Sequence, residues 1–289
     1  MKAHLETLLA TTDAVERLAS DPLGVARRYT RPDDLEIAAL VASSLAFGQV
    51  ATIRARVTRV LDALGDRPAQ AARERTLAQH RRALRGFVHR VWRGDDVAWL
   101  IAGAGGVARA DGSLGAAFVK GHDEARAVGA SDGEQLRLAL ASFVDRLMGA
   151  SGAPTPPPRG LRHLLPDPRA GSACKRLLLF LRWMIRPADG VDLGLWPVAP
   201  SVLLVPVDTH IHRIALNLRM TSRTDVSWRT AEEITAALRK LDPDDPVRFD
   251  FALCHFGISR QCPSQRDDAR CGRCVLRPVC RHWSGPAVP

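Results

Sequence analysis

Four cysteines near the C-terminus constrain the fold of this chain more than any other feature of its sequence. They stand at Cys262, Cys271, Cys274 and Cys280, separated by eight, two and five residues. Thiolates are soft ligands, and four of them in so short a stretch can enclose an iron–sulfur cluster or a tetrahedral zinc ion. A zinc ribbon usually presents two C-x2-C pairs, and this stretch has one. The spacing predicts a metal-binding loop over 262–280 and leaves cluster and zinc open.

The composition describes a folded, basic protein. The chain has 289 residues, 46% of them hydrophobic, enough for one large or two modest domains. Lysine and arginine total 41 against 31 aspartate and glutamate, and the resulting net charge of +10 favours a polyanionic partner. The N-terminus has no signal-peptide pattern, and no apolar stretch of about 18 residues occurs. We therefore expect a cytoplasmic protein with reduced thiols and no membrane partner.

Helical periodicity dominates the sequence, and no convincing alternation of period two is present, so we expect an all-α protein. The Gly/Ala-rich segment 102–117 and the Pro-rich segment 153–158 are expected to be loops. Segment 186–208, interrupted by glycines and prolines, is expected to be a buried irregular connector. The predicted helices are 3–19, 35–45, 50–64, 69–93, 95–109, 133–149, 171–186, 208–219, 228–241 and 245–257.

A motif about fifty residues before the cysteine loop carries a family resemblance. Residues 207–213 read V-D-T-H-I-H-R. Together with the cysteine loop, this motif resembles the endonuclease III branch of the helix-hairpin-helix DNA glycosylase superfamily. In that branch V-D-T-H-x-x-R carries the catalytic aspartate, and cysteines spaced six, two and five hold a [4Fe-4S] cluster. Segments W-M-I-R-P-A-D-G-V-D-L-G-L-W and D-P-D-D-P-V-R-F-D-F-A-L also resemble an uncharacterised bacterial family related to these glycosylases.

The resemblance implies two helical lobes with a cleft between them. Residues 33–203 would form the central lobe, and 1–32 plus 204–289 the second lobe, ending in the loop 262–280. It also favours a [4Fe-4S] cluster over zinc as the group held by the four cysteines. The implied partner is double-stranded DNA, bound by a monomer associated with the nucleoid.

The residue that the resemblance assigns to catalysis is Asp208. Cleavage of an N-glycosidic bond builds positive charge on the sugar, and a carboxylate beside the anomeric carbon stabilises that charge and accepts a proton from water. An aspartate before Thr-His and an apolar run is also an ordinary helix N-cap, and both roles can coexist.

Further residues are expected to contact the DNA. Segment 42–53 resembles the superfamily's L-L-S-A-Q-x-T-D junction, whose glutamine, here Gln49, enters the space left by a flipped base. Phe47 and Trp196 are candidates for lining a base pocket, with burial in the core as the alternative. Arginines are expected to contact phosphates or to support the surrounding structure. They are Arg213, Arg266, Arg270 and Arg273.

Two departures from the family pattern shape the functional prediction. The hairpin L-P-G-x-G-x-x-T-A is missing from 186–207, and residues 176–239 contain no lysine. Without an amine near Asp208, strand cleavage through a Schiff base lacks its nucleophile. We therefore expect a monofunctional glycosylase that hydrolyses a damaged or mispaired base from DNA. The alternatives are a non-catalytic iron–sulfur protein that binds lesions or unusual DNA structures, and a redox sensor.

Overall fold

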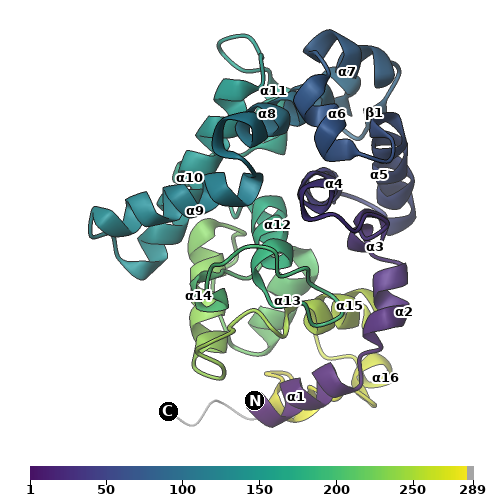
Figure 1. Ribbon diagram of the computed structural model, residues 1–289. Coiled ribbons are helices and arrows are strands. Elements are labelled where there is room, and N and C mark those ends of the chain that lie inside the picture. Colours follow the sequence, from purple (N-terminus) through teal and green to yellow (C-terminus); the bar gives the residue numbers. More distant parts are fainter. Residues whose placement is uncertain (285–289) are drawn as a thin grey trace.

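The computed structural model describes residues 1–284 and confirms an all-α protein, with 61% helix and 2% strand (Figure 1). Within these residues no helix is long and apolar enough to cross a membrane. The elements are α1 (Lys2–Ala10), α2 (Ala14–Ala19), α3 (Pro22–Ala26), α4 (Pro32–Ser44), α5 (Val50–Leu64), α6 (Pro68–Glu74), α7 (Leu77–Ala83), β1 (Val88–His89), β2 (Trp92–Arg93), α8 (Gly94–Asp111), α9 (Leu114–Ala127), α10 (Asp132–Ala150), α11 (Arg159–Leu164), η1 (Pro168–Ala170), α12 (Lys175–Ile185), η2 (Pro200–Val202), α13 (Thr209–Asn217), α14 (Trp228–Arg239), α15 (Asp250–Arg260), α16 (Asp268–Cys271) and η3 (Arg277–Val279).

Three sequence predictions about local structure are wrong. The helix expected over 3–19 is two helices, α1 and α2. The single helix expected over 69–93 is two short helices, α6 and α7, followed by the antiparallel hairpin β1–β2. The loop expected over 102–117 is helical, because α8 continues to Asp111 and α9 begins three residues later. The glycines of α8 serve close packing: a Cβ at Gly103 or Gly105 would collide with the carbonyl oxygen of Leu147 or Ala72. The glycines of this segment therefore mark close contacts between helices and not the end of a helix.

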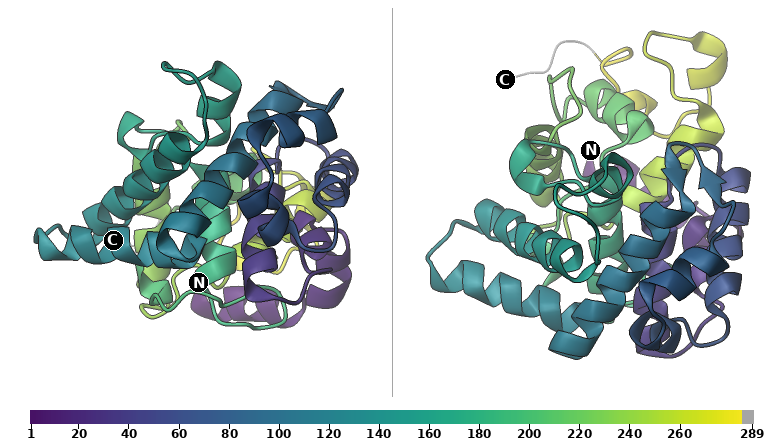
Figure 2. Two further views of the ribbon diagram at one scale, coloured as in Figure 1. Left: turned by 45° about the horizontal axis from the view of Figure 1, so that its top comes forward. Right: turned by 90° about the horizontal axis from the view of Figure 1, so that it is seen from above.

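Segments distant in sequence lie together in the folded chain. Helix α10 packs along α8 and α9, and α12 packs against α4 (Figure 2). The N-terminal helix α1 lies near α15 and the C-terminal segment, and Arg248 forms an ion pair with Glu6 at 2.9 Å. Helix α1 and the described C-terminal segment thus share one region, at the bottom of Figure 1.

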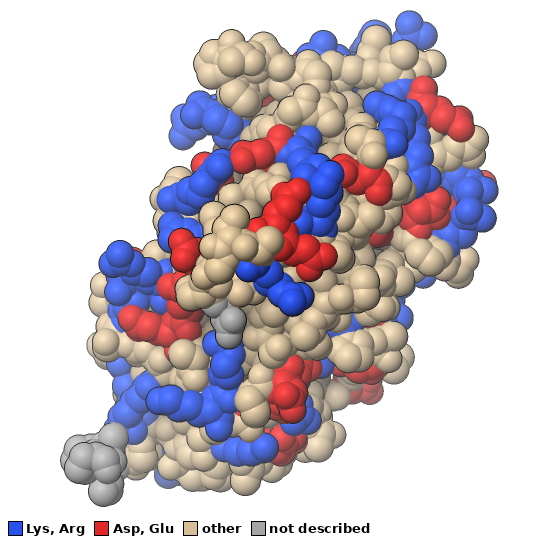
Figure 3. Space-filling model, turned by 60° about the vertical axis from the view of Figure 1, so that its left-hand side comes forward, with Lys and Arg blue, Asp and Glu red and all other residues tan. Residues whose placement is uncertain are grey.

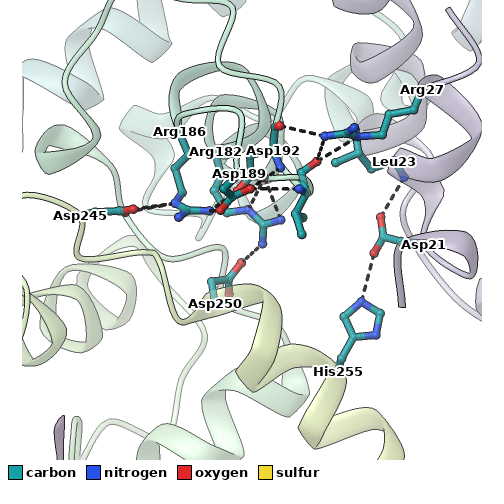
Figure 4. Close-up of polar contacts among 11 residues, drawn as sticks. Asp21, Leu23, Arg27, Arg182, Arg186, Asp189, Asp192, Asp245, Asp250 and His255 are labelled. Atoms are coloured by element: carbon teal, nitrogen blue, oxygen red, sulfur yellow. Dashed lines mark hydrogen bonds and ion pairs between the residues drawn. The ribbon is translucent and has the colours of Figure 1, made fainter. Parts of the chain in front are cut away.

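A buried ion-pair network holds the connector 186–208 in place (Figure 4). Arg182 of α12 contacts Asp192 of the connector at 3.1 Å and also Asp250 at the start of α15. All three side chains are almost fully buried. Arg186 adds contacts to Asp192 and to Asp245. The connector is therefore irregular, as the sequence predicts, but it is only partly buried, because residues 187–190 are exposed. Its fixed position depends on charges that are largely shielded from water.

We expect Arg182→Gln to destabilise the protein by roughly 3–5 kcal/mol, because it leaves the buried Asp250 carboxylate without its cation and removes one of the two cations that contact Asp192. The measurement is the free energy of unfolding in urea. As a matched control, Arg169→Gln removes an arginine whose ion pair with Asp145 is half exposed, and it should cost less than about 1 kcal/mol. Equal destabilisation by the two variants would contradict a structural role for the buried network.

Candidate functional site

A cavity of about 930 Å³ lies beside Asp208. It is lined by the start of α3, the α4–α5 loop, the α11–α12 loop, the start of α13 and one face of α15. Gln49, Lys175, Asp208 and Cys254 all face this space. Its volume lies within the range of about 300–1,000 Å³ that is usual for small-molecule sites, and most of its surface is apolar.

The Asp208 carboxylate has one oxygen held by the backbone and one directed toward other side chains. Its Oδ1 accepts hydrogen bonds from the backbone N–H groups of His210 and Ile211, at 2.9 and 2.8 Å, which confirms the N-cap of α13. Its Oδ2 lies 3.8 Å from the Lys175 ammonium and 3.8 Å from the Cys254 thiol. The carboxylate is 18% exposed, so it is fixed in orientation and still reachable from the cavity.

The expectation that no amine lies near Asp208 is wrong. Lys175 is the first residue of α12, one position before the lysine-free span 176–239. The connector folds back over α12 and returns the chain to this helix, so the lysine and the aspartate meet although 33 positions separate them in the sequence. Only four lysines occur in the chain, and this one opens a helix after a glycine-containing loop. That local context is the sequence signal that could have identified it.

A helical hairpin also lies beside the cavity, earlier in the chain than expected. Helices α11 and α12 are joined by residues 165–174, which begin with Leu165-Pro166 and include Gly171 at a φ of +80°. Pro166, Ser172 and Ala173 of this loop line the Asp208 cavity. Because the loop leads into the N-terminus of α12, it brings unpaired backbone N–H groups to the cavity, an arrangement suited to anions.

The α4–α5 loop forms another edge of the cavity. Gln49 is exposed, precedes α5 and makes no side-chain capping bond. Phe47 is 46% exposed and stands beside it, with the Arg90 guanidinium 5.1 Å from its ring centre. Trp196, the other aromatic candidate, is instead in the core and stacks on Phe118 at 5.3 Å.

The four C-terminal cysteines line a second cavity together. They are free thiols, and the cavity is bordered by apolar side chains together with Asn217, Arg277 and His282. Burial raises the pKa of the Cys262 thiol, and the charges of the other three cysteines raise it further. Cys174 and Cys254 lie elsewhere, at the Asp208 cavity. The residues that surround the second cavity besides the cysteines include Ile214, Leu218, Phe256 and Leu276.

The placement of these sulfurs bears on the group that they would hold. In residues 1–284 no three His, Cys, Asp or Glu side chains are arranged to hold a single metal ion. A tetrahedral zinc ion with bonds of about 2.3 Å draws its four sulfurs to within about 4 Å of one another. The four thiols border one small cavity of about 20 Å³, and thiolates are ligands for both iron–sulfur clusters and zinc ions.

Asn217, which sequence reasoning missed, anchors both ends of the cysteine loop. Its side-chain N–H group lies 3.4 Å from the sulfur of Cys262 and donates to the carbonyl oxygen of Pro263 at 2.9 Å. Its side-chain oxygen lies 3.0 Å from the ring nitrogen of His282. Arg213 also supports this loop, because it donates to the carbonyl oxygen of Cys262 at 3.3 Å. An N–H group directed at a ligand sulfur is the kind of contact that orients metal ligands.

The arginines expected to contact DNA from this loop have nearby partners of their own. Arg266 and Arg270 each pair with a neighbouring aspartate, at 3.0 and 3.4 Å. Arg266 and Arg277 both place their guanidinium groups 4.0 Å from the ring centre of Trp283. Arg273 is exposed. The loop therefore carries less uncompensated positive charge than its arginine content suggests.

Comparison with known proteins places the chain in one family. It belongs to a family described as proteins of unknown function (DUF2400), whose sequence profile matches residues 21–259. The matched region includes the whole Asp208 cavity and ends before the cysteine loop. No curated protein and no solved structure matches the chain.

We expect protein purified without oxygen to be brown and to contain about four iron and four sulfide per chain, because the four cysteines border one cavity and thiolates are the ligands of such clusters. Cys274→Ser should lose most of this iron, whereas Cys174→Ser should keep it, since Cys174 lies at the other cavity. Iron and sulfide analysis with the visible absorption spectrum provides the measurement. A colourless protein with one zinc would refute the cluster.

Proposed function

We propose that this protein is a DNA glycosylase that hydrolyses the N-glycosidic bond of a damaged or mispaired base in double-stranded DNA. The observation that carries the proposal is the Asp208 carboxylate, with Oδ1 fixed by two backbone N–H groups and Oδ2 reachable from a cavity. A fixed carboxylate at the edge of a cavity suits a reaction in which positive charge develops on a sugar.

The proposed reaction needs one carboxylate and one water molecule. As the bond between C1′ and the base nitrogen breaks, the base leaves with the electron pair and C1′ acquires cationic character. Asp208 Oδ2 stabilises that cation. The water oxygen then bonds to C1′, and its proton passes to Asp208. The second oxygen stays in its two hydrogen bonds, so the carboxylate does not rotate away during the reaction.

The cavity supports entry of a base that has left the helix. Such a base must be unstacked, at a cost of a few kcal/mol, and side chains that fill the gap offset part of that cost. Gln49 and Phe47 stand exposed at the edge of the cavity, where they would fill the gap. In this proposal the cavity lies in the cleft between a central lobe, 33–203, and a second lobe built from 1–32 and 204–289.

The cysteine loop is assigned a structural role. Cys262, Cys271, Cys274 and Cys280 would hold a [4Fe-4S] cluster, which would cross-link the loop to itself rather than supply a reacting group. Asn217 would orient Cys262 and keep the two ends of the loop together. Arg266, Arg270 and Arg273 would then contact DNA only where phosphates displace or add to their present partners.

Lys175 favours a second candidate activity, cleavage of the DNA strand. Its amine nitrogen would bond to C1′ as the base leaves, the sugar ring would open to an imine, and loss of a C2′ proton would expel the 3′ phosphate. The supporting observation is the 3.8 Å distance between the Lys175 nitrogen and Asp208. An ammonium group paired with a carboxylate cannot act as a nucleophile until it loses a proton. Hydrolysis without strand cleavage is therefore the leading proposal.

We expect wild-type protein to release a base in single-turnover reactions with duplexes carrying uracil, hypoxanthine, alkylated, oxidised or mismatched bases. Asp208→Asn should lower that rate at least about a hundredfold, because it removes the negative charge opposite the developing cation. Products are read before and after alkaline cleavage of the strand. If both proteins bind the duplexes and neither releases a base, the protein is a non-catalytic DNA-binding protein.

Strand cleavage is tested by trapping with borohydride, which reduces an imine to a stable covalent adduct. We expect no adduct with the wild type, because an amine that stays paired with the Asp208 carboxylate does not attack the sugar. Lys240→Gln, at the far end of α14, is the matched control. An adduct that Lys175→Gln abolishes and Lys240→Gln keeps would establish the lyase instead.

A further inference from the structure

Four arginines from three segments gather on the side of the cavity bounded by the α4–α5 loop. Arg56 and Arg59 lie three positions apart on α5 and therefore share one face of that helix. Arg85 lies between α7 and β1, and Arg90 lies in the turn between β1 and β2. We call Arg56, Arg59, Arg85 and Arg90 the arginine strip. None of these residues belongs to the motifs that suggested DNA binding from the sequence.

Side-chain contacts place the members of the strip next to one another. The Arg59 guanidinium donates to the carbonyl oxygen of Arg85 at 3.2 Å. The Arg59 guanidinium also stands 5.7 Å from the ring centre of Phe87, which leads into β1. Burial lowers the pKa of His89, and the positive charges of Arg56 and Arg90 lower it further. Arg90 in turn stands 5.1 Å from the ring centre of Phe47, at the edge of the cavity. The strip thus runs from the outer face of α5 to the cavity.

The charge of the strip is not compensated by the protein. Within residues 1–284 none of its four arginines forms an ion pair with a carboxylate. Arginines elsewhere on the surface do, as Arg169 does with Asp145 and Arg223 does with Asp225. On the face shown in Figure 3, side chains of both signs are interspersed. Four guanidinium groups without acidic partners in one place produce a local positive field that attracts a polyanion.

The backbone holds the end of the strip in an unusual conformation. Arg90 has a φ of +55°, a left-handed value that is uncommon for a residue other than glycine. The ladder between Val88 and Arg93 closes this two-residue turn and fixes the direction in which Arg90 projects. Gly48 allows the contact, because a Cβ there would come to 3.0 Å from the Arg90 side chain. Strained residues of this kind persist where the surrounding structure supports them.

We propose that the arginine strip binds the phosphate backbone of duplex DNA beside the cavity. This inference rests on the proposed function and extends it, because it identifies where the helix adjoining the flipped nucleotide would lie. Guanidinium groups suit phosphates because they donate several hydrogen bonds from a planar fork. The strip ends at the exposed ring of Phe47, which offers a stacking surface to a base. Phosphate contacts followed by a stacking surface match a nucleic acid rather than an acidic protein.

The test compares two triple variants from which the same number of positive charges is removed. The strip variant carries Arg56→Gln, Arg85→Gln and Arg90→Gln, and it keeps Arg59 because that side chain bonds to the backbone. The control variant carries Arg126→Gln, Arg169→Gln and Arg223→Gln, which remove arginines already paired with carboxylates. Circular dichroism and thermal unfolding confirm that both are folded.

Binding to an undamaged fluorescent duplex is measured by anisotropy over a series of salt concentrations. For the strip variant we expect affinity about tenfold or more weaker at low salt, because three phosphates lose their cationic partners. The log–log salt slope should become smaller by about 0.9 for each neutralised phosphate, or about 2.7 for three. The control variant should keep the wild-type slope. Equal weakening in the two variants would assign the effect to net charge and overturn the proposal, as would wild-type binding by the strip variant.

Two further readouts separate this inference from the proposed glycosylase activity. The binding assay uses undamaged DNA and is repeated in Asp208→Asn, so it does not depend on catalysis. If the strip variant keeps both wild-type base release and wild-type duplex binding, the proposal about the arginine strip is wrong and the glycosylase proposal stands. If the wild type releases no base but its duplex binding depends on the strip, the glycosylase proposal is wrong and the proposal about the strip stands. Displacement of the duplex by a lower concentration of single-stranded RNA would overturn the assignment to duplex DNA.

Discussion

The position of the candidate site depends on the buried Arg182 guanidinium. This one cation contacts Asp192 in the connector and Asp250 at the start of α15, while its own helix, α12, begins with Lys175. The connector leads directly into Asp208, and α15 carries Cys254 to within 3.8 Å of that carboxylate. Three of the elements around the cavity are thus joined through a charge that has no access to water. Because a buried charge tolerates little displacement from its partners, the network fixes geometry at the site.

Local sequence patterns predict much of the site but not its neighbours in space. Asp208 and the four cysteines stand out in short motifs, in which the chemistry and the spacing occupy a few consecutive residues. Lys175 is marked locally only as one of four lysines, at the start of a helix. Its contact with Asp208 requires the connector to fold back over α12, and no local pattern encodes that path. Asn217 escapes prediction for a similar reason, since a lone asparagine at a helix end carries no signal of the loop that it holds.

The errors in secondary structure have equally specific causes. The glycines of α8 suggest breaks in the sequence, whereas they allow the helix to lie close to the backbones of Ala72 and Leu147. The hairpin β1–β2 has only two residues in each strand, too few for an alternating pattern to be visible. The arginine strip is also beyond sequence patterns, because its members come from three segments and their lack of acidic partners is a property of the folded surface.

Helix α13 has a mechanical consequence for the protein. Asp208 caps its N-terminus, and Asn217, its last residue, holds the sulfur of Cys262 and the carbonyl oxygen of Pro263. A helix of nine residues spans about 13 Å and moves as a rigid rod. The carboxylate and the cysteine loop therefore occupy opposite ends of one lever. The anchoring of the loop by Asn217 and the position of the carboxylate beside Lys175 are thus linked through the axis of one helix.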